Sequence, residues 1–301
     1  MTEQQALDPL TAMLMQNPPR DALEFRAMLD GFALAMNGTL PDIGGSTDDV
    51  TLFKAGGVNV TADIHRPKGD GPFPVLVYLH GGGWIMGTPK THRRLAFRFA
   101  EAGYLVVNVH YRLAPEFPFP AAFDDCVAAI RWVADNIDRY GGDPARLAVG
   151  GDSAGGNLAA AAAATLQGQG GADIKAVLLI YPALDFANMD SAGAELPGGG
   201  NVMEMMVGSY IGHDREALIK DWRVSPIHAA ERLPAVHLMC GTADGLMRDA
   251  DAMAARLRAA SIKHEFVTYK NMPHGFAQME EMFPEARVSI ARMIDFLREN
   301  V

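Results

Sequence analysis

Residues 147–156 read LAVGGDSAGG, a short apolar run followed by a glycine-flanked serine. The segment contains the pattern Gly-x-Ser-x-Gly, with Gly151 and Gly155 two positions before and after Ser153. The apolar run before it and the alanine-rich segment 157–166 after it predict a strand, a tight turn and a helix. Glycines at the flanking positions allow a turn so tight that the serine is strained and its hydroxyl projects from the helix start. The pattern therefore predicts an exposed serine nucleophile.

A glycine-rich turn that binds phosphate is the alternative interpretation of the same segment. Neither G-x-G-x-x-G nor the P-loop pattern G-x-x-x-x-G-K-[ST] occurs at a strand-to-helix junction of this chain. The serine interpretation is therefore favoured, although this one pattern by itself is only suggestive.

The alternation of strand and helix continues on both sides of this segment. Continuous Val-, Ile- and Leu-rich runs, typical of parallel strands buried on both faces, occur at 75–79, 105–109, 147–149, 176–181 and 236–240. Helix-like segments occur at 92–102, 121–139, 154–166 and 248–260, and a last strand (264–269) and helix (284–299) follow. Strands at 50–54 and 58–66 flank a Gly-Gly pair and predict an antiparallel edge hairpin. We expect an α/β fold with a mostly parallel eight-stranded sheet and helices on both faces.

Two regions fall outside this alternation. Residues 1–45 contain helical pattern at 7–15 and 20–36 before any strand, and residues 187–225 form an insertion between strands. The insertion contains Gly198-Gly199-Gly200 and then a run of large apolar residues: Met203, Met205, Met206, Tyr210 and Trp222. Methionine stripes are usually core, but these lie outside the sheet pattern. We expect both regions to form a helical cap on a catalytic domain made of residues 46–186 and 226–301.

Composition indicates a globular protein and disfavours several partners. The 301 residues are 49% hydrophobic and 21% charged, and the formal net charge is −10. Because no basic face is indicated, we expect neither nucleic acid nor a membrane as partner. The start MTEQQALDPL has no basic flank followed by an apolar stretch, which predicts a cytoplasmic location.

Cysteine and histidine spacing predicts neither a disulfide nor a metal site. The two cysteines, Cys126 and Cys240, both lie in apolar segments, so we expect two buried free thiols. No Cys/His spacing resembles a metal site, and we expect no cofactor.

A serine nucleophile needs a base and an acid that orients the base. Of the nine histidines, His274 lies in a loop after the last strand, at the sheet edge where parallel strands place functional groups. In enzymes whose nucleophilic serine lies at such a strand-to-helix turn, the acid comes between the serine and the histidine in the chain. Asp244 meets this condition and follows the strand 236–240. Asp249 is an alternative candidate for the acid, but it resembles a helix cap or dipole partner, and Asp185 is a weaker candidate one strand earlier.

Two other histidines have structural roles in this interpretation. We expect His80 to fix its loop and His92 to cap a helix.

Four motifs in order resemble the bacterial hormone-sensitive-lipase family of carboxylesterases. They are HGGGW at 80–84, YRLAPE at 111–116, FPFPAA at 117–122 and GDSAGG at 151–156, the last typical of one subgroup. Two positions depart from the family pattern. The acid segment reads Asp244-Gly245-Leu246 where D-P-L is common, and His110 replaces an acidic or small residue. Neither departure removes a catalytic group.

The resemblance implies a capped α/β-hydrolase that needs no cofactor, cleaves small esters of short to medium acyl chains and often forms a homodimer. It implies Ser153 as nucleophile, Asp244 as acid and His274 as base. The backbone N–H groups of Gly82, Gly83 and Ala154 would form the oxyanion hole, with Gly81 as the spare donor. Candidates for the substrate pocket are Trp84, Asp152, Met206, Tyr210 and Phe276; core packing is the alternative for the apolar ones.

Other function classes remain open. A receptor that binds ligand without turnover is disfavoured because His274 is present. A serine peptidase shares the fold and the triad, but the chain is too short for a propeller-type gating domain and HGGG fits esterases better. A deacetylase for a sugar or xenobiotic is a further alternative that the triad does not exclude.

Overall fold

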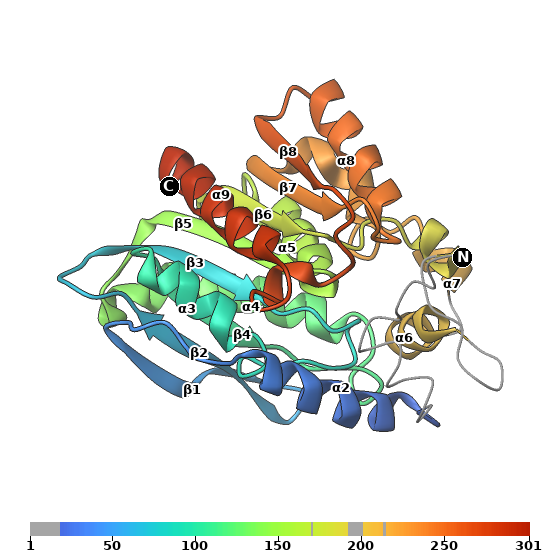
Figure 1. Ribbon diagram of the computed structural model, residues 1–301, viewed down its shortest axis with the longest axis horizontal. Coiled ribbons are helices and arrows are strands. Elements are labelled where there is room, and N and C mark those ends of the chain that lie inside the picture. The colour runs from blue at the N-terminus through green and yellow to red at the C-terminus, as the bar shows by residue number, and fades with distance from the viewer. Residues whose placement is uncertain (1–18, 170, 192–200, 213–214) are drawn as a thin grey trace, which may run out of the picture.

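The computed structural model describes residues 19–169, 171–191, 201–212 and 215–301 (Figure 1). The expected helix at 7–15 and the glycine run at 198–200 lie outside these residues. One eight-stranded sheet runs through the molecule in the order β1-β2-β4-β3-β5-β6-β7-β8. The strands are β1 (Gly45–Ala55), β2 (Val58–Arg66), β3 (Phe73–Leu79), β4 (Leu105–His110), β5 (Gly142–Asp152), β6 (Ile174–Ile180), β7 (Ala235–Gly241) and β8 (His264–Tyr269).

The predicted mixture of parallel and antiparallel strands is confirmed. β1 pairs antiparallel with β2, and β2 pairs antiparallel with β4. All pairs from β4 to β8 are parallel. The inner strands β3, β4, β6 and β7 are almost wholly buried, as their continuous apolar sequences require, while the edge strand β8 is only partly buried.

Two strands, β1 and β5, begin well before their predicted starts. β5 begins at Gly142 rather than at 147, because Gly142 pairs with Phe73 of β3, although the residues between this pair and Leu147 are partly exposed. β1 begins at Gly45 because an edge strand can carry exposed polar side chains and still pair through its backbone. An apolar pattern cannot indicate either extension.

Helices cover both faces of the sheet (Figure 1). On one face lie α4 (Ala121–Asn136), α5 (Ala154–Leu166) and α8 (Met247–Ala259); on the other lie α3 (Arg93–Glu101) and α9 (Pro284–Asn300). There are also short 3₁₀ helices, which are η1 (Ile137–Tyr140), η2 (Phe186–Ser191), η3 (Pro226–Arg232) and η4 (Phe276–Gln278). This layering encloses the core and exposes the carboxyl ends of the parallel strands at one edge.

Three helices lie outside the layers, in the regions where a cap is expected. They are α2 (Ala22–Met36), α6 (Val202–Ile211) and the short α7 (Arg215–Leu218). β3 points toward the side of the molecule where α6 lies, and α2 contacts α6 (Figure 1). α2 begins at Asp21, whose side chain accepts hydrogen bonds from the N–H groups of Leu23 and Glu24.

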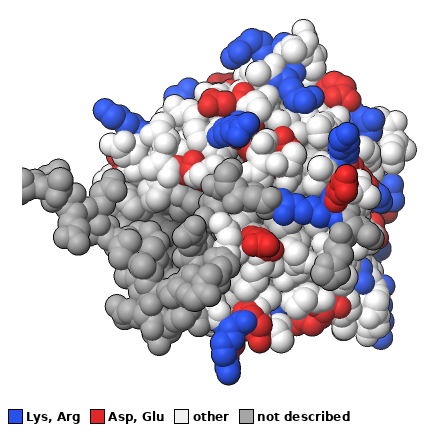
Figure 2. All heavy atoms as spheres, turned by 90° about the vertical axis from the view of Figure 1, so that its right-hand side faces the viewer, with Lys and Arg blue, Asp and Glu red and all other residues white. Residues whose placement is uncertain are grey.

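Acidic and basic side chains lie interspersed on the described part of the face drawn in Figure 2. Among the described residues, no helix combines the length and the apolar character that crossing a bilayer requires.

Candidate active site

The turn at Ser153 has the strained geometry that its sequence predicts. Ser153 lies between the end of β5 and the start of α5, with φ 54° and ψ −118°. The elbow packs directly against the end of β3. A Cβ at Gly155 would lie 1.9 Å from the Leu79 carbonyl oxygen, and one at Gly151 would lie 2.5 Å from the same atom. Only glycine fits at these two positions, so the contact with β3 fixes the place of the serine.

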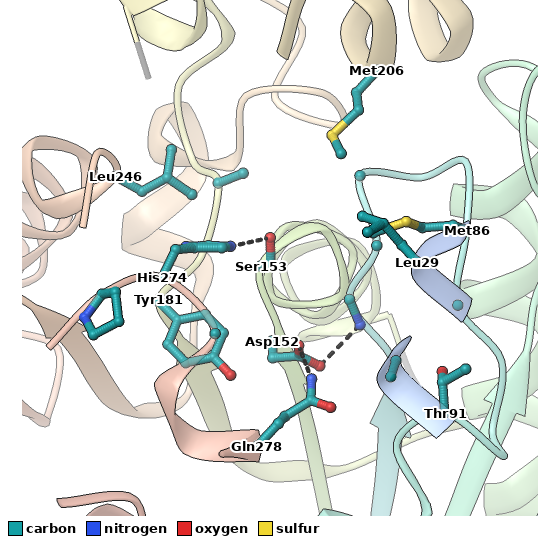
Figure 3. Close-up of a pocket in the computed structure, with 18 of the residues that line it drawn as sticks. Leu29, Met86, Thr91, Asp152, Ser153, Tyr181, Met206, Leu246, His274 and Gln278 are labelled. Atoms are coloured by element: carbon teal, nitrogen blue, oxygen red, sulfur yellow. Dashed lines mark hydrogen bonds between the residues drawn. The ribbon is translucent and has the colours of Figure 1, made fainter. Parts of the chain in front are cut away.

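Three side chains from distant parts of the sequence form a continuous hydrogen-bonded chain. His274 Nε2 lies 2.9 Å from Ser153 Oγ (Figure 3), and His274 Nδ1 lies 2.8 Å from Asp244 Oδ2. Ser153 follows β5, Asp244 follows β7 and His274 follows β8, so all three lie at the carboxyl edge of the sheet. The structure therefore brings together the three residues that the sequence analysis selected as nucleophile, acid and base.

The charges of the histidine and the aspartate stabilise each other. Burial by itself would raise the pKa of Asp244, but the neighbouring His274 outweighs this effect and the pKa is lowered. The loss of solvent around the His274 ring would by itself lower its pKa, but the charge and hydrogen bond of Asp244 outweigh this effect and the pKa is raised. Asp244 Oδ1 also accepts a hydrogen bond from Leu246 N–H at 2.8 Å, which orients the carboxylate. The pair is arranged to stabilise an imidazolium ion.

The glycine loop after β3 runs beside the serine. The Gly81 N–H donates to Asp152 Oδ1 at 2.9 Å and is therefore already engaged. Gly82 and Gly83 both have positive φ, at 123° and 56°. In the described part of the chain, no hydrogen bond is donated by the N–H groups of Gly82, Gly83 or Ala154. These three donors are free to bind another group.

Asp152 ties together three segments of the site, a role that the sequence analysis missed. Its Oδ1 accepts hydrogen bonds from Tyr78 Oη at 2.7 Å and from Gly81 N–H, and its Oδ2 accepts from Gln278 Nε2 at 2.9 Å. It thereby joins the glycine loop and the loop of His274 to the elbow itself (Figure 3). His92 Nε2 lies 3.3 Å from Oδ2. Burial raises the pKa of Asp152, but His92 and the hydrogen bonds outweigh it and lower the pKa to about 2.

The expected helix cap at His92 is wrong, and of the two roles expected for Asp249, helix cap or dipole partner, the cap is not found. His92 precedes α3 but makes no capping hydrogen bond, because its ring points instead to Asp152. Asp249 makes no capping hydrogen bond to α8, but it lies in the first turn of that helix, where a dipole partner is expected. Its Oδ2 accepts the N–H groups of Leu184 and Asp185, both at 2.9 Å, and so holds the segment after β6. The position of each residue near the start of a helix suggested a capping role. Contacts with distant segments instead decide where the His92 and Asp249 side chains point.

A cavity of about 460 Å³ opens over the serine. Trp84, Asp152 and Met206 line it, as expected for pocket residues, and Met206 points toward Ser153 (Figure 3). Tyr210 and Phe276 do not line it. Both are fully buried, because Tyr210 stacks behind Trp84 with ring centres 4.9 Å apart and Phe276 packs 5.9 Å from Tyr181.

Several cavity residues were not anticipated from the sequence. Tyr181 lines the cavity and packs edge-on against the His274 ring at 5.0 Å. The helix α2 contributes Phe25, Leu29, Asp30, Phe32 and Ala33. The helical pattern at 20–36 marked this helix but could not indicate which residues face the site.

Both cysteines are buried free thiols, as predicted. Among the described residues, no group of three or more His, Cys, Asp and Glu side chains is arranged to hold a metal ion.

Comparison with known proteins assigns the fold and the chemistry. Residues 76–278 match a family model described as the alpha/beta hydrolase fold. The chain is 36% identical to a carboxylesterase of Mycobacterium tuberculosis over 238 residues, covering 75% of this chain and 73% of that protein. It is 31% identical to an ethyl acetate hydrolase of Pseudomonas putida over 265 residues, covering 84% and 82%.

Solved structures agree with the relatives. The Pyrobaculum calidifontis esterase superposes with a TM-score of 0.86 at 30% identity and covers 98% of this chain and 99% of its own. An esterase of the bacterial hormone-sensitive lipase family gives a TM-score of 0.79 at 30% identity, with 96% of each chain covered. The chain therefore belongs to the α/β-hydrolase family, as a carboxylesterase of the hormone-sensitive-lipase type.

Proposed function

We propose that the protein hydrolyses carboxylic esters of short to medium acyl chains with Ser153, His274 and Asp244 as its catalytic triad. The observation that carries this proposal is the unbroken chain of hydrogen bonds, 2.9 Å from Ser153 to His274 and 2.8 Å from His274 to Asp244, at the floor of a cavity. A neutral imidazole at this distance accepts the hydroxyl proton as the serine oxygen attacks.

The reaction proceeds in two halves. Ser153 Oγ bonds to the ester carbonyl carbon while its proton moves to His274 Nε2, and the imidazolium then gives that proton to the departing alcohol oxygen. A water molecule next attacks the acyl-serine ester, again losing its proton to His274, and the carboxylic acid and free serine result. Asp244 holds the ring through Nδ1 and stabilises its charge in both halves, in keeping with the raised pKa of His274.

Backbone donors stabilise the oxyanion that forms during each attack. We assign them to Gly82, Gly83 and Ala154, whose N–H groups are free in the described part of the chain. Gly81 is not a spare donor, because Asp152 accepts its hydrogen bond. Losing one such donor typically costs about 10²- to 10³-fold in rate.

The cavity supports a substrate of modest size. Its volume of about 460 Å³ is in the range typical of small-molecule sites. Leu29 of α2 and Met206 of α6 both line it, which supports the assignment of residues 1–45 and 187–225 as a cap that selects the acyl chain. We expect activity to fall sharply beyond medium chains in a series of para-nitrophenyl esters from acetyl to dodecanoyl.

The triad is tested by Ser153→Ala. The variant should lose turnover of para-nitrophenyl butyrate while it unfolds in urea as the wild type does. Ser46→Ala, in the exposed edge strand β1, is the matched control and should keep full activity. Near-normal activity of Ser153→Ala would overturn the assignment, as would a phosphonate ester that labels the wild type and Ser153→Ala equally in mass spectrometry.

A further inference from the structure

The cavity wall contains one carboxylate that the triad does not use. Asp30 of α2 lines the cavity, and its Oδ1 accepts the Gly87 N–H at 2.9 Å. Its Oδ2 accepts no hydrogen bond within the described part of the chain and is not among the fully buried unpartnered atoms. One oxygen of Asp30 is therefore bound to the protein and the other is available to a ligand.

The other carboxylates of the cavity are fully engaged. Asp152 accepts hydrogen bonds on both oxygens, and Asp244 is bound to His274 and to the Leu246 N–H. No Lys or Arg is among the described residues that line the cavity. The nearby Arg26 on the same helix is paired with Glu116 at 2.7 Å. Among the described residues of the cavity wall, Asp30 therefore has no Lys or Arg bonded to it, and the charges of Arg26 and His92 act on it only at longer range.

Asp30 lies beside the loop after β3, where its side chain accepts the Gly87 N–H. Its neighbour Leu29 and Met86 lie on the side of Ser153 away from His274 (Figure 3). Phe25 and Phe32, on the same helix as Asp30, also line the cavity. Aromatic rings and a carboxylate together suit an alkylated ammonium group better than a second anion.

We propose that Asp30 is a specificity-determining residue that binds a cationic group of the substrate, so that the enzyme prefers esters carrying a quaternary or protonated amine over neutral esters of the same shape. The proposal rests on the proposed function of Ser153. The cation belongs either to the alcohol part or to the acyl part of the ester, and the experiment separates the two. Burial raises the pKa of Asp30, an effect that a bound cation would oppose.

Two pairs of substrates test the proposal at pH 8, where the carboxyl is ionised. The alcohol pair is acetylcholine and its carbon isostere, in which a tert-butyl group replaces trimethylammonium. The acyl pair is the para-nitrophenyl ester of γ-(trimethylammonio)butyrate and the matching tert-butyl compound. Within each pair only the charge differs, so the ratio of the two kcat/KM values measures the recognition of charge.

The variant Asp30→Asn removes the charge but keeps an oxygen that can accept the Gly87 N–H. In the pair that places its cation at Asp30, the ratio of charged to neutral kcat/KM should fall about three- to tenfold. The neutral isostere should change by less than about twofold. Asp70→Asn, an exposed residue in the turn before β3, makes the same change in net charge and should leave both ratios unaltered.

The outcomes are distinguishable. If Asp30→Asn leaves both ratios unchanged, or slows charged and neutral substrates equally, Asp30 serves only to hold Gly87 and the proposal is overturned. If the wild type hydrolyses no ester, the proposed function fails instead. In that case, calorimetry measures how tightly each compound of the two pairs binds to Ser153→Ala and to the double variant Ser153→Ala/Asp30→Asn. If the ratio of charged to neutral affinity is the same for the two proteins, the proposal is overturned.

Discussion

Replacing Asp152 with Asn should destabilise the protein at neutral pH, because its buried carboxylate is held in the charged form by surrounding donors. Tyr78, Gly81 and Gln278 donate to it at 2.7, 2.9 and 2.9 Å. An amide has nearly the same shape but no charge, so it represents the protonated carboxyl. The substitution therefore isolates the contribution of the charge.

The size of the effect follows from the pKa of Asp152, which folding lowers from 3.8 to about 2. At about 1.4 kcal/mol for each pKa unit, the charged form stabilises the folded protein by roughly 2 kcal/mol at pH 7. Because the folded-state pKa is the lower one, this contribution is complete well above pH 4 and is lost as the pH falls through about 2. At pH 3 about 1 kcal/mol should remain.

The measurement is urea unfolding followed by tryptophan fluorescence at pH 7 and at pH 3. The difference in unfolding free energy between wild type and Asp152→Asn should fall by about half between the two. Asp249→Asn is the matched control: burial raises the pKa of Asp249, so removing its charge should be neutral or stabilising at pH 7. A cost for Asp152→Asn that is equal at both pH values, or below about 0.5 kcal/mol at pH 7, would refute the reasoning.

Two further predictions concern the triad and the elbow. Since His274 must be neutral to act as base and its pKa is raised, the acidic limb of kcat/KM should lie above the ordinary histidine pKa of about 6.5. Asp244→Asn should move that limb to lower pH and reduce kcat by about 10⁴-fold, as pH-rate profiles would reveal; an unmoved limb would contradict the assignment. Gly155→Ala should cost about 3 kcal/mol or more in urea unfolding, because the new Cβ would lie 1.9 Å from the Leu79 carbonyl oxygen. Gly31→Ala, with no atom within 4 Å of the new Cβ, should be neutral or stabilising, and equal effects of the two substitutions would disprove the argument.

The parts of the molecule that follow local rules could be predicted from the sequence. Continuous apolar runs marked the parallel strands, and the glycines around Ser153 marked the elbow. The histidine and the aspartate could be selected because the carboxyl ends of parallel strands meet at one edge of the sheet, and the structure brings both to Ser153.

The cavity wall could not be predicted in the same way. Tyr210 and Phe276 have the size and apolar character of pocket residues, but whether they line a cavity or pack behind it depends on neighbours from other segments. The same limit applies to Asp30 of α2 and to Asp152, whose partners lie far away in the sequence. The cytoplasmic location and the homodimer stay predictions.

The contact between the elbow and the end of β3 has a consequence for changing this protein by design. The strand that closes on Gly151 and Gly155 continues directly into Gly81, Gly82 and Gly83. The attacking oxygen and the N–H groups beside it are therefore aligned mainly by one crossing of two backbones, to which α2 adds the hydrogen bonds of Arg26 to Ile85 O and of Gly87 N–H to Asp30. Libraries that randomise the cavity-lining residues of α2 and α6 but keep Arg26 and Asp30 can vary substrate choice, while any library that includes the crossing itself would yield mostly inactive members.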